Sequence, residues 1–240
     1  MNQIEDLLCF DIETVAKYEY YSEMTEKEKD IFTTFFYKRK VIDRIDYFET
    51  EPDGDRKYYE SAQPVPEFSI PICISLGRFV DGEIVVQSLT SDGTEESIIK
   101  MLKTFAKTVR NHPEMTLSGW NINGFDVPYL NRFFVKYGIE IPVAMSQRTK
   151  PWERQVIDLM EVWKGGKYDT LPSLEIVSNF LGISDSKEEM HGVDTSRYFY
   201  GKMYIEMSAT EGRAMIKKYC EADVKSTLEI AEKMKISKMI

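Results

Sequence analysis

Histidine is scarce in this sequence, since His112 and His191 are the only two among 240 residues. This scarcity argues against a metal site built from imidazole nitrogens. Any bound metal would be held mainly by oxygen, which favours magnesium or manganese. Cysteine is almost as rare. Cys9, Cys73 and Cys220 lie far apart and are odd in number, so neither a zinc-binding spacing nor a disulfide framework is indicated, and a reducing cytoplasm fits.

Long apolar runs and an excess of basic charge are also missing. No apolar run approaches the roughly 20 residues that span a bilayer. The first ten residues, MNQIEDLLCF, lack the basic start and the cleavage site of a signal peptide. We therefore expect a cytoplasmic protein without a membrane partner. The net charge of −9 argues against tight non-specific duplex binding, but metal ions in an acidic pocket would reverse the local charge, so a pocket for one strand end stays open.

The content of hydrophobic and aromatic residues, 42% and 12%, is that of a globular protein. Apolar periodicity and a DG turn predict strands at 4–13, 71–80, 83–89 and 116–122, and a further strand over QVIDLMEVW (155–163). Helical spacing predicts helices at 91–109, 126–139, 171–183 and 208–235. This order predicts an α/β fold with a central mixed β-sheet flanked by α-helices. We expect a single domain over 1–240, with an insertion at 17–66 that forms a flap beside the active site.

Acidic residues occur in unusual places in three segments. In LLCFDIET, Asp11 and Glu13 interrupt an apolar strand and point to the same face. Two such carboxylates repel each other unless a proton or a cation lies between them. Asp126 follows an apolar strand and an NG turn, and Tyr219 and Asp223 stand four apart on one face of the last helix. If the segments converge, the four acids form a cluster that fits two-metal hydrolysis of a phosphodiester.

The motifs FDIET, NINGFD and Tyr-x-x-x-Asp, in this order, resemble the three exonuclease motifs of the DnaQ-like DEDD superfamily. The tyrosine matches the DEDDy branch of that superfamily. SLEIVSNFLGI, MHGVDTSRYFYGK and IKKYCEADVKSTLEI are similar to a narrower group, the 3′–5′ exonucleases related to the proofreading domain of family B DNA polymerases. The resemblance covers about 4–13 and 68–235, and it implies an RNase H-like fold. Segment 14–66 matches no motif.

The resemblance also implies a role for each motif residue. Asp11 would bridge two divalent ions, Mg²⁺ or Mn²⁺, while Glu13 and Asp223 would complete the first metal site. Asp126 would bind the second metal ion, and Tyr219 would orient the nucleophilic water. Further residues fall where the family contacts the terminal nucleotide or supports the site: Thr14, Asn121 and Phe125.

The implied activity is a metal-dependent 3′–5′ exonuclease that releases nucleoside 5′-monophosphates from single-stranded or frayed DNA ends. A replication or repair protein would be a fitting partner. Two alternatives stay open: an exoribonuclease with the same site, because fold does not fix the substrate, and a non-catalytic nucleic-acid-binding module on the same fold. The basic and aromatic run FFYKR at 35–39 could touch a bound strand. Asp158 could belong to the site or be structural.

Overall fold

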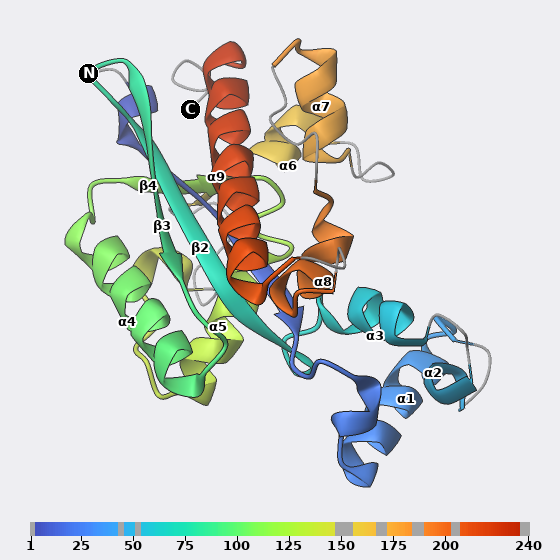
Figure 1. Ribbon diagram of the computed structural model, residues 1–240. Coiled ribbons are helices and arrows are strands. Elements are labelled where there is room, and N and C mark those ends of the chain that lie inside the picture. Colours follow the sequence, from blue (N-terminus) through green and yellow to red (C-terminus); the bar gives the residue numbers. More distant parts are fainter. Residues whose placement is uncertain are drawn as a thin grey trace. The chain divides into compact units, whose positions relative to one another are not determined.

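The computed structural model describes residues 3–42, 46–50, 54–146, 156–166, 172–183, 190–202 and 207–235. The chain divides into two compact units (Figure 1). The first, here called the sheet unit, consists of Met1–Glu13, Ile72–Glu189 and Lys217–Ile240. The second, called the aromatic unit, consists of Thr14–Pro71 and Met190–Ile216. The predicted insertion therefore belongs to a unit that also draws on a later part of the chain.

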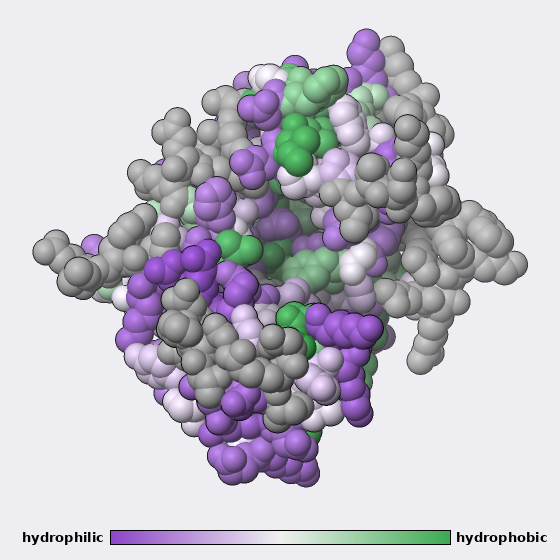
Figure 2. Space-filling view, turned by 90° about the vertical axis from the view of Figure 1, so that its right-hand side faces the viewer, coloured by the Kyte–Doolittle hydropathy of each residue, from purple (hydrophilic) through white to green (hydrophobic). Residues whose placement is uncertain are grey.

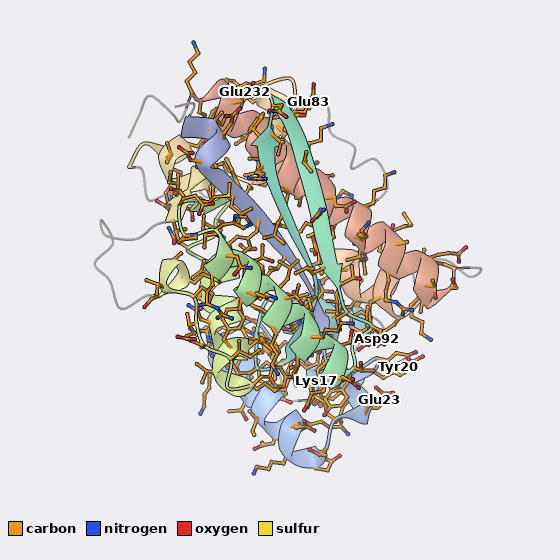
Figure 3. All side chains as sticks on the ribbon, turned by 90° about the vertical axis from the view of Figure 1, so that its left-hand side faces the viewer. Lys17, Tyr20, Glu23, Glu83, Asp92 and Glu232 are labelled. Atoms are coloured by element: carbon orange, nitrogen blue, oxygen red, sulfur yellow. The ribbon has the colours of Figure 1, made fainter. Side chains whose placement is uncertain are left out.

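A five-stranded sheet with the order β3-β2-β1-β4-β5 forms the centre of the fold. β1 is parallel to β4 and β4 is parallel to β5, whereas β2 and β3 are antiparallel, so the sheet is mixed, as predicted. Asp81 and Gly82 between β2 and β3 both have positive φ, as a type I′ hairpin turn requires. Figure 3 labels Glu83, the first residue of β3, and Asp92, which lies two residues beyond its end. The strands are β1 Leu7–Ala16, β2 Ser69–Val80, β3 Glu83–Thr90, β4 Thr116–Gly119 and β5 Val156–Asp158.

Helices pack on both faces of this sheet (Figure 1). Neighbouring residues of β1 point to opposite faces. Phe10 meets Phe105 of α4 with ring centroids 5.0 Å apart, whereas Cys9 clusters with Val224 and Leu228 of α9 on the other face. The carboxylates that alternate with Phe10 therefore face α9. The helices are α4 Glu95–Asn111, α5 Asp126–Lys136, α6 Leu159–Lys164, α7 Leu174–Phe180 and α9 Ala209–Lys233.

Several elements differ from their predicted extent, and β4, for example, ends at Gly119 rather than at 122. Within the run QVIDLMEVW, Val156–Asp158 form β5 and α6 begins at Leu159, so its prediction as one strand was wrong. The reason is that the Asp158 side chain caps the helix by accepting hydrogen bonds from the backbone N–H groups of Met160 and Glu161. In addition, β1 begins at residue 7 rather than 4, because a 3₁₀ turn precedes it.

The aromatic unit has a hydrophobic core of its own. The ring of Phe32 lies 4.7 Å from that of Phe36, 5.0 Å from that of Phe48 and 4.8 Å from that of Phe68, measured between centroids. Tilted and edge-on ring pairs of this kind add about 0.5–1.5 kcal/mol each to burial of apolar area. The helices of the unit are α1 Glu26–Lys38, α2 Tyr47–Thr50, α3 Gly54–Ala62 and α8 Thr195–Phe199. Its role as a flap stays a prediction.

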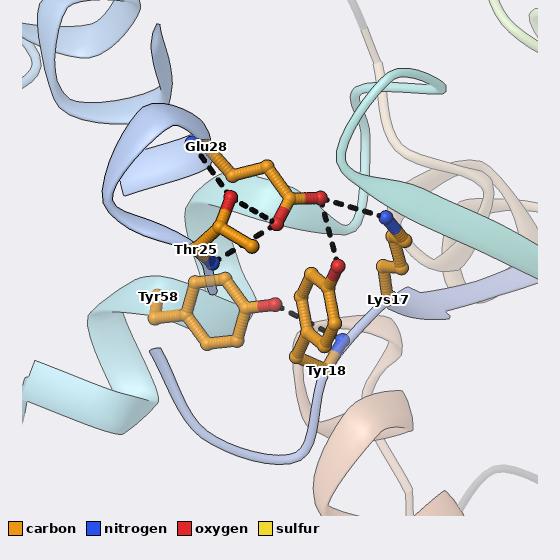
Figure 4. Close-up of polar contacts among 5 residues, drawn as sticks. All are labelled: Lys17, Tyr18, Thr25, Glu28 and Tyr58. Atoms are coloured by element: carbon orange, nitrogen blue, oxygen red, sulfur yellow. Dashed lines mark hydrogen bonds and ion pairs between the residues drawn. The ribbon is translucent and has the colours of Figure 1, made fainter. Parts of the chain in front are cut away.

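Glu28 joins three segments of the aromatic unit (Figure 4). Its carboxylate accepts hydrogen bonds from Lys17 Nζ at 2.9 Å, Tyr18 Oη at 2.7 Å and Thr25 Oγ1 at 2.8 Å. The Tyr18 N–H in turn donates to Tyr58 Oη at 3.1 Å. The bond from Lys17, followed by those from Tyr18 and Thr25, lowers the pKa of Glu28 to about 2. The network fixes the chain that follows β1 to the start of α1.

The surface carries its hydrophobic residues in scattered positions. On the face shown in Figure 2, hydrophobic residues form small groups among predominantly hydrophilic ones. Val135, Val143 and Phe180 are the most exposed of the large apolar residues described, and they come from three different helical elements. Isolated exposed apolar residues are normal for folded proteins. No helix within the described ranges is long and apolar enough to cross a membrane.

Candidate metal centre

Asp11 and Glu13 lie side by side on β1, as the strand alternation predicts. Their carboxylate oxygens and the Sγ atom of Cys220 on α9 all lie within 4.8 Å of one another. Glu13 is buried and Asp11 is half-buried. Like charges this close are unfavourable unless a proton or a cation compensates them. The chemistry of the cluster therefore fits a divalent cation.

Cys220 is a part of this cluster to which the sequence did not point. Its Sγ donates to Asp11, lying 3.4 Å from Oδ2 and 3.5 Å from the backbone oxygen. Burial above all, then the adjacent Cys73 and the charges of Asp11 and Glu13, raise the pKa of the Cys220 thiol well above its usual value. The group is therefore a thiol that orients the Asp11 carboxylate. One signal was available, because Cys220 stands three residues before Asp223 and so shares its helix face.

Asp126 reaches the same strand from the first turn of α5. Its Oδ1 accepts a hydrogen bond from the backbone N–H of Ile12 at 3.1 Å, and only 3% of the residue is exposed. Burial, followed by the negative charge of Asp11, raises the pKa of Asp126 well above its usual value. The ionised form of Asp126 therefore needs nearby positive charge, which a divalent cation would supply.

Asp158 holds the loop between β4 and α5. Its carboxylate accepts from the backbone N–H groups of Asn121 and Asn123, each at 3.0 Å, in addition to capping α6 through Met160 at 3.1 Å and Glu161 at 3.4 Å. The residue is 4% exposed. Its oxygens are thus engaged by backbone donors, and the loop they fix leads directly into α5. We assign Asp158 a structural role at the edge of the site.

Tyr219 and Asp223 stand on α9 next to Cys220, one residue before it and three after it. At 100° per residue, all three share one side of the helix. Cys220 reaches Asp11 from this side. Asp223 is buried and Tyr219 is half-buried. The helix that delivers the thiol therefore presents the third motif to the sheet unit.

The three predicted substrate-binding residues have different surroundings. Thr14 belongs to the aromatic unit, where its hydroxyl donates to the backbone oxygen of Gln63 at 2.8 Å. Asn121 adopts φ 56°, in the left-handed region that asparagine tolerates better than most residues. The ring of Phe125 packs on Tyr129, with centroids 5.5 Å apart. Contact of these residues with a nucleotide stays a prediction.

The sequence matches a known protein family over most of its length. The profile of the RNase H superfamily matches residues 65–235, which is more than half of the 240 residues. The chain belongs to the RNase H superfamily. Among solved structures, this superfamily member is similar to the family B DNA polymerase from the hyperthermophilic archaeon Pyrobaculum calidifontis, with 17% identity and a TM-score of 0.59. The match covers 95% of this chain but 24% of the polymerase, so the likeness concerns the fold of one part of that enzyme.

Membership of the RNase H superfamily and the mixed sheet confirm the predicted fold class and family. The matched range includes Asp126, Tyr219 and Asp223 but begins after Asp11 and Glu13. It also leaves out nearly all of segment 14–66, where the sequence shows no motif. No curated protein matches the sequence. RNase H-like proteins are generally nucleases that use divalent metals.

Proposed function

We propose that this chain is a metal-dependent 3′–5′ exonuclease that hydrolyses the terminal phosphodiester of DNA and releases nucleoside 5′-monophosphates. The observation that carries the proposal is the cluster of Asp11, Glu13 and Cys220 within 4.8 Å. Asp126 is bonded to the same strand at Ile12. Superfamily membership and a fold shared with part of a family B polymerase support this assignment.

The donor set fits Mg²⁺ or Mn²⁺. Carboxylate oxygens are the hard ligands that these ions prefer, and the ions would be held by Asp11, Glu13, Asp126 and Asp223. The Cys220 thiol donates to Asp11 and has a raised pKa, so it does not offer the thiolate that would favour zinc. When bound, the ions supply a more acidic water and stabilise charge on the attacking and leaving oxygens.

The chain's own side chains would position the reactants. Tyr219 stands one turn before Asp223 on α9, where its hydroxyl would orient the attacking water. Cys220 fixes the carboxylate of Asp11 by hydrogen bonding. Asp158 fixes the loop that leads into α5, and so helps to position Asp126, the first residue of that helix. Positioning of a catalytic group to within a fraction of an ångström is worth orders of magnitude in rate.

Labelled oligonucleotides test the proposal. DNA and RNA oligomers labelled at the 3′ or the 5′ end are incubated with Mn²⁺, and the products are resolved by length. We expect strands labelled at the 3′ end to release the label at once as a mononucleotide. Strands labelled at the 5′ end should shorten stepwise. If RNA is hydrolysed faster than DNA, RNA is the preferred substrate and the DNA assignment is wrong. If the chain binds the strands but forms no product, it is a non-catalytic binding module and not a nuclease.

A further inference from the structure

The C-terminal end of α1 carries a run of cations in an acidic chain. Residues 37–41, with the sequence YKRKV, are all exposed, including 46% of Tyr37 and 58% of Val41. Within the described ranges, none of Lys38, Arg39 and Lys40 forms an ion pair with an acid. The helix dipole favours cations in a last turn, so their charge alone carries little meaning. The backbone beside them adds a second observation.

Lys40 occupies a backbone position that favours glycine. Its φ is 58°, in the left-handed region. The Lys40 N–H donates to the Tyr37 oxygen at 3.0 Å, and the Val41 N–H donates to the Phe36 oxygen at 3.1 Å. This pair of bonds is a Schellman closure, in which the left-handed residue is usually glycine because a Cβ atom is disfavoured there.

Among the described residues, two other helices end with the same pair of bonds, and both use glycine. After α5, Gly138 has φ 62° and the Ile139 N–H donates to the Phe134 oxygen at 2.8 Å. After α7, Gly182 has φ 63° and the following N–H donates to the Ser178 oxygen at 2.9 Å. The end of α1 therefore keeps a lysine where the fold would favour glycine. A left-handed lysine also follows α9, where Lys235 has φ 50° and its N–H donates to the Glu232 oxygen at 3.0 Å. The strain at Lys40 therefore supports a function of its side chain only together with the groups beside it.

Aromatic rings lie next to these cations. The Arg39 guanidinium carbon stands 3.6 Å from the ring centroid of Phe35, and its Nη1 donates to the Phe35 backbone oxygen at 3.5 Å. Tyr37 presents a second, exposed ring. Phe36, which the sequence suggested as a contact for a strand, is 5% exposed in the core and anchors the helix end instead. Exposed rings and guanidinium planes stack on bases, while cations bind phosphates.

We propose that the end of α1 is a second binding surface for single-stranded nucleic acid, built from residues of the aromatic unit and none of the metal centre. This strand-holding patch consists of Phe35, Tyr37, Lys38, Arg39 and Lys40. Phosphates would meet the two lysines, and bases would stack on Tyr37 and on the guanidinium plane of Arg39. A duplex hides the faces of its bases, and an acidic protein segment would use the charges but not the rings. The identity of the polymer rests on the proposed function, but binding requires neither metal nor cleavage.

The test measures binding by fluorescence anisotropy in EDTA at several salt concentrations. Lys38, Arg39 and Lys40 are replaced together by glutamine. Each phosphate contact on a single strand contributes about 0.7 to the slope of log K against log salt concentration, so loss of the two lysine contacts should make the slope shallower by about 1.4. Lys27→Gln is the matched control, since Lys27 is exposed at the other end of the same helix, and it should leave the slope unchanged.

Two further variants separate stacking and folding from charge. Tyr37→Ala should weaken binding of an oligothymidylate of about 30 nucleotides by about tenfold, but not binding of an abasic strand of equal length. Lys40→Gly should raise the melting temperature, because it relieves the left-handed strain, and yet weaken strand binding. A triple variant with the wild-type slope, a Lys40→Gly variant with wild-type affinity, or tighter binding of duplex than of single strand would overturn the proposal. These three results are distinguishable from failure of the proposed exonuclease function. In that case the oligomer would be bound at the patch but not hydrolysed with Mn²⁺.

Discussion

Asp158→Ala should destabilise the protein by about 3 kcal/mol. The variant removes the acceptor for the backbone N–H groups of Asn121 and Asn123, both at 3.0 Å, and for the helix-capping bond of Met160 at 3.1 Å. Loss of a helix cap costs about 1 kcal/mol. Each N–H left without a buried partner costs about 1–3 kcal/mol, and we take the lower end because both loop residues are partly exposed. At about 2–4 °C per kcal/mol, the melting temperature should fall by about 6–12 °C.

Asp158→Asn and an exposed aspartate provide the comparison. Asn keeps one acceptor oxygen and removes a buried charge whose pKa is raised by burial, so we expect a loss of only about 1 kcal/mol. Asp92→Asn is the matched control, because Asp92 accepts from the Thr94 N–H at 3.0 Å in an exposed turn. Its effect should stay within about 0.5 kcal/mol.

The assay is urea unfolding, followed by a thermal scan with and without Mn²⁺. A free energy of unfolding for Asp158→Ala within about 0.5 kcal/mol of wild type would refute the structural reasoning, since a surface residue changes stability by no more than this. A folded Asp158→Asn variant that has lost stabilisation by Mn²⁺ would show instead that Asp158 is a metal ligand.

Two other predictions concern the Tyr219 hydroxyl and the Glu28 carboxylate. Tyr219→Phe keeps the ring and loses the hydroxyl, so turnover should fall by about 10–1,000-fold while Mn²⁺ still stabilises the fold. Full activity of this variant from pH 7 to 9 would show that the Tyr219 side chain serves only packing. The pKa of Glu28 is lowered from 4.5 to about 2, first by the hydrogen bond from Lys17. Because the folded-state pKa lies below the ordinary value, the stability that Glu28 contributes is present above pH 4.5 and is lost as the pH falls toward about 2. Glu28→Gln should therefore flatten the acid limb of stability against pH, and identical acid-unfolding curves for variant and wild type would contradict this.

The sequence predicted the local features of the site well. The two-residue period of a strand places Asp11 and Glu13 on one face, and the structure has them there. The DG turn predicts the β2–β3 hairpin, which pairs from Val80 with Glu83 to Cys73 with Thr90. These features depend on residues that are near one another in the chain, so a local pattern is sufficient to predict them.

Long-range packing explains what the sequence did not predict. Cys220 meets Asp11 across a separation of 209 residues, and no local pattern encodes such a contact. Similarly, Gln63 accepts from the Ser196 N–H and donates to the Gly192 oxygen, each at 3.0 Å. This pair of bonds joins 14–71 to 190–216 in the aromatic unit, whereas the sequence indicated only an insertion. The ambiguous run around Asp158 became part strand and part helix because side-chain capping was decided by tertiary contacts.

The claim that Asp11 and its neighbours bind the ions needed for hydrolysis is tested most directly by Asp11→Ala. Mn²⁺-dependent release of a 3′ label from single-stranded DNA is measured together with the melting temperature, with Asp81→Asn in the exposed hairpin turn as control. We predict that Asp11→Ala loses both hydrolysis and stabilisation by Mn²⁺, while the metal-free variant melts no lower than metal-free wild type, because a like-charge repulsion has been removed. The control should behave as wild type. Metal-dependent hydrolysis by Asp11→Ala at more than about a tenth of the wild-type rate would contradict a ligand role for Asp11.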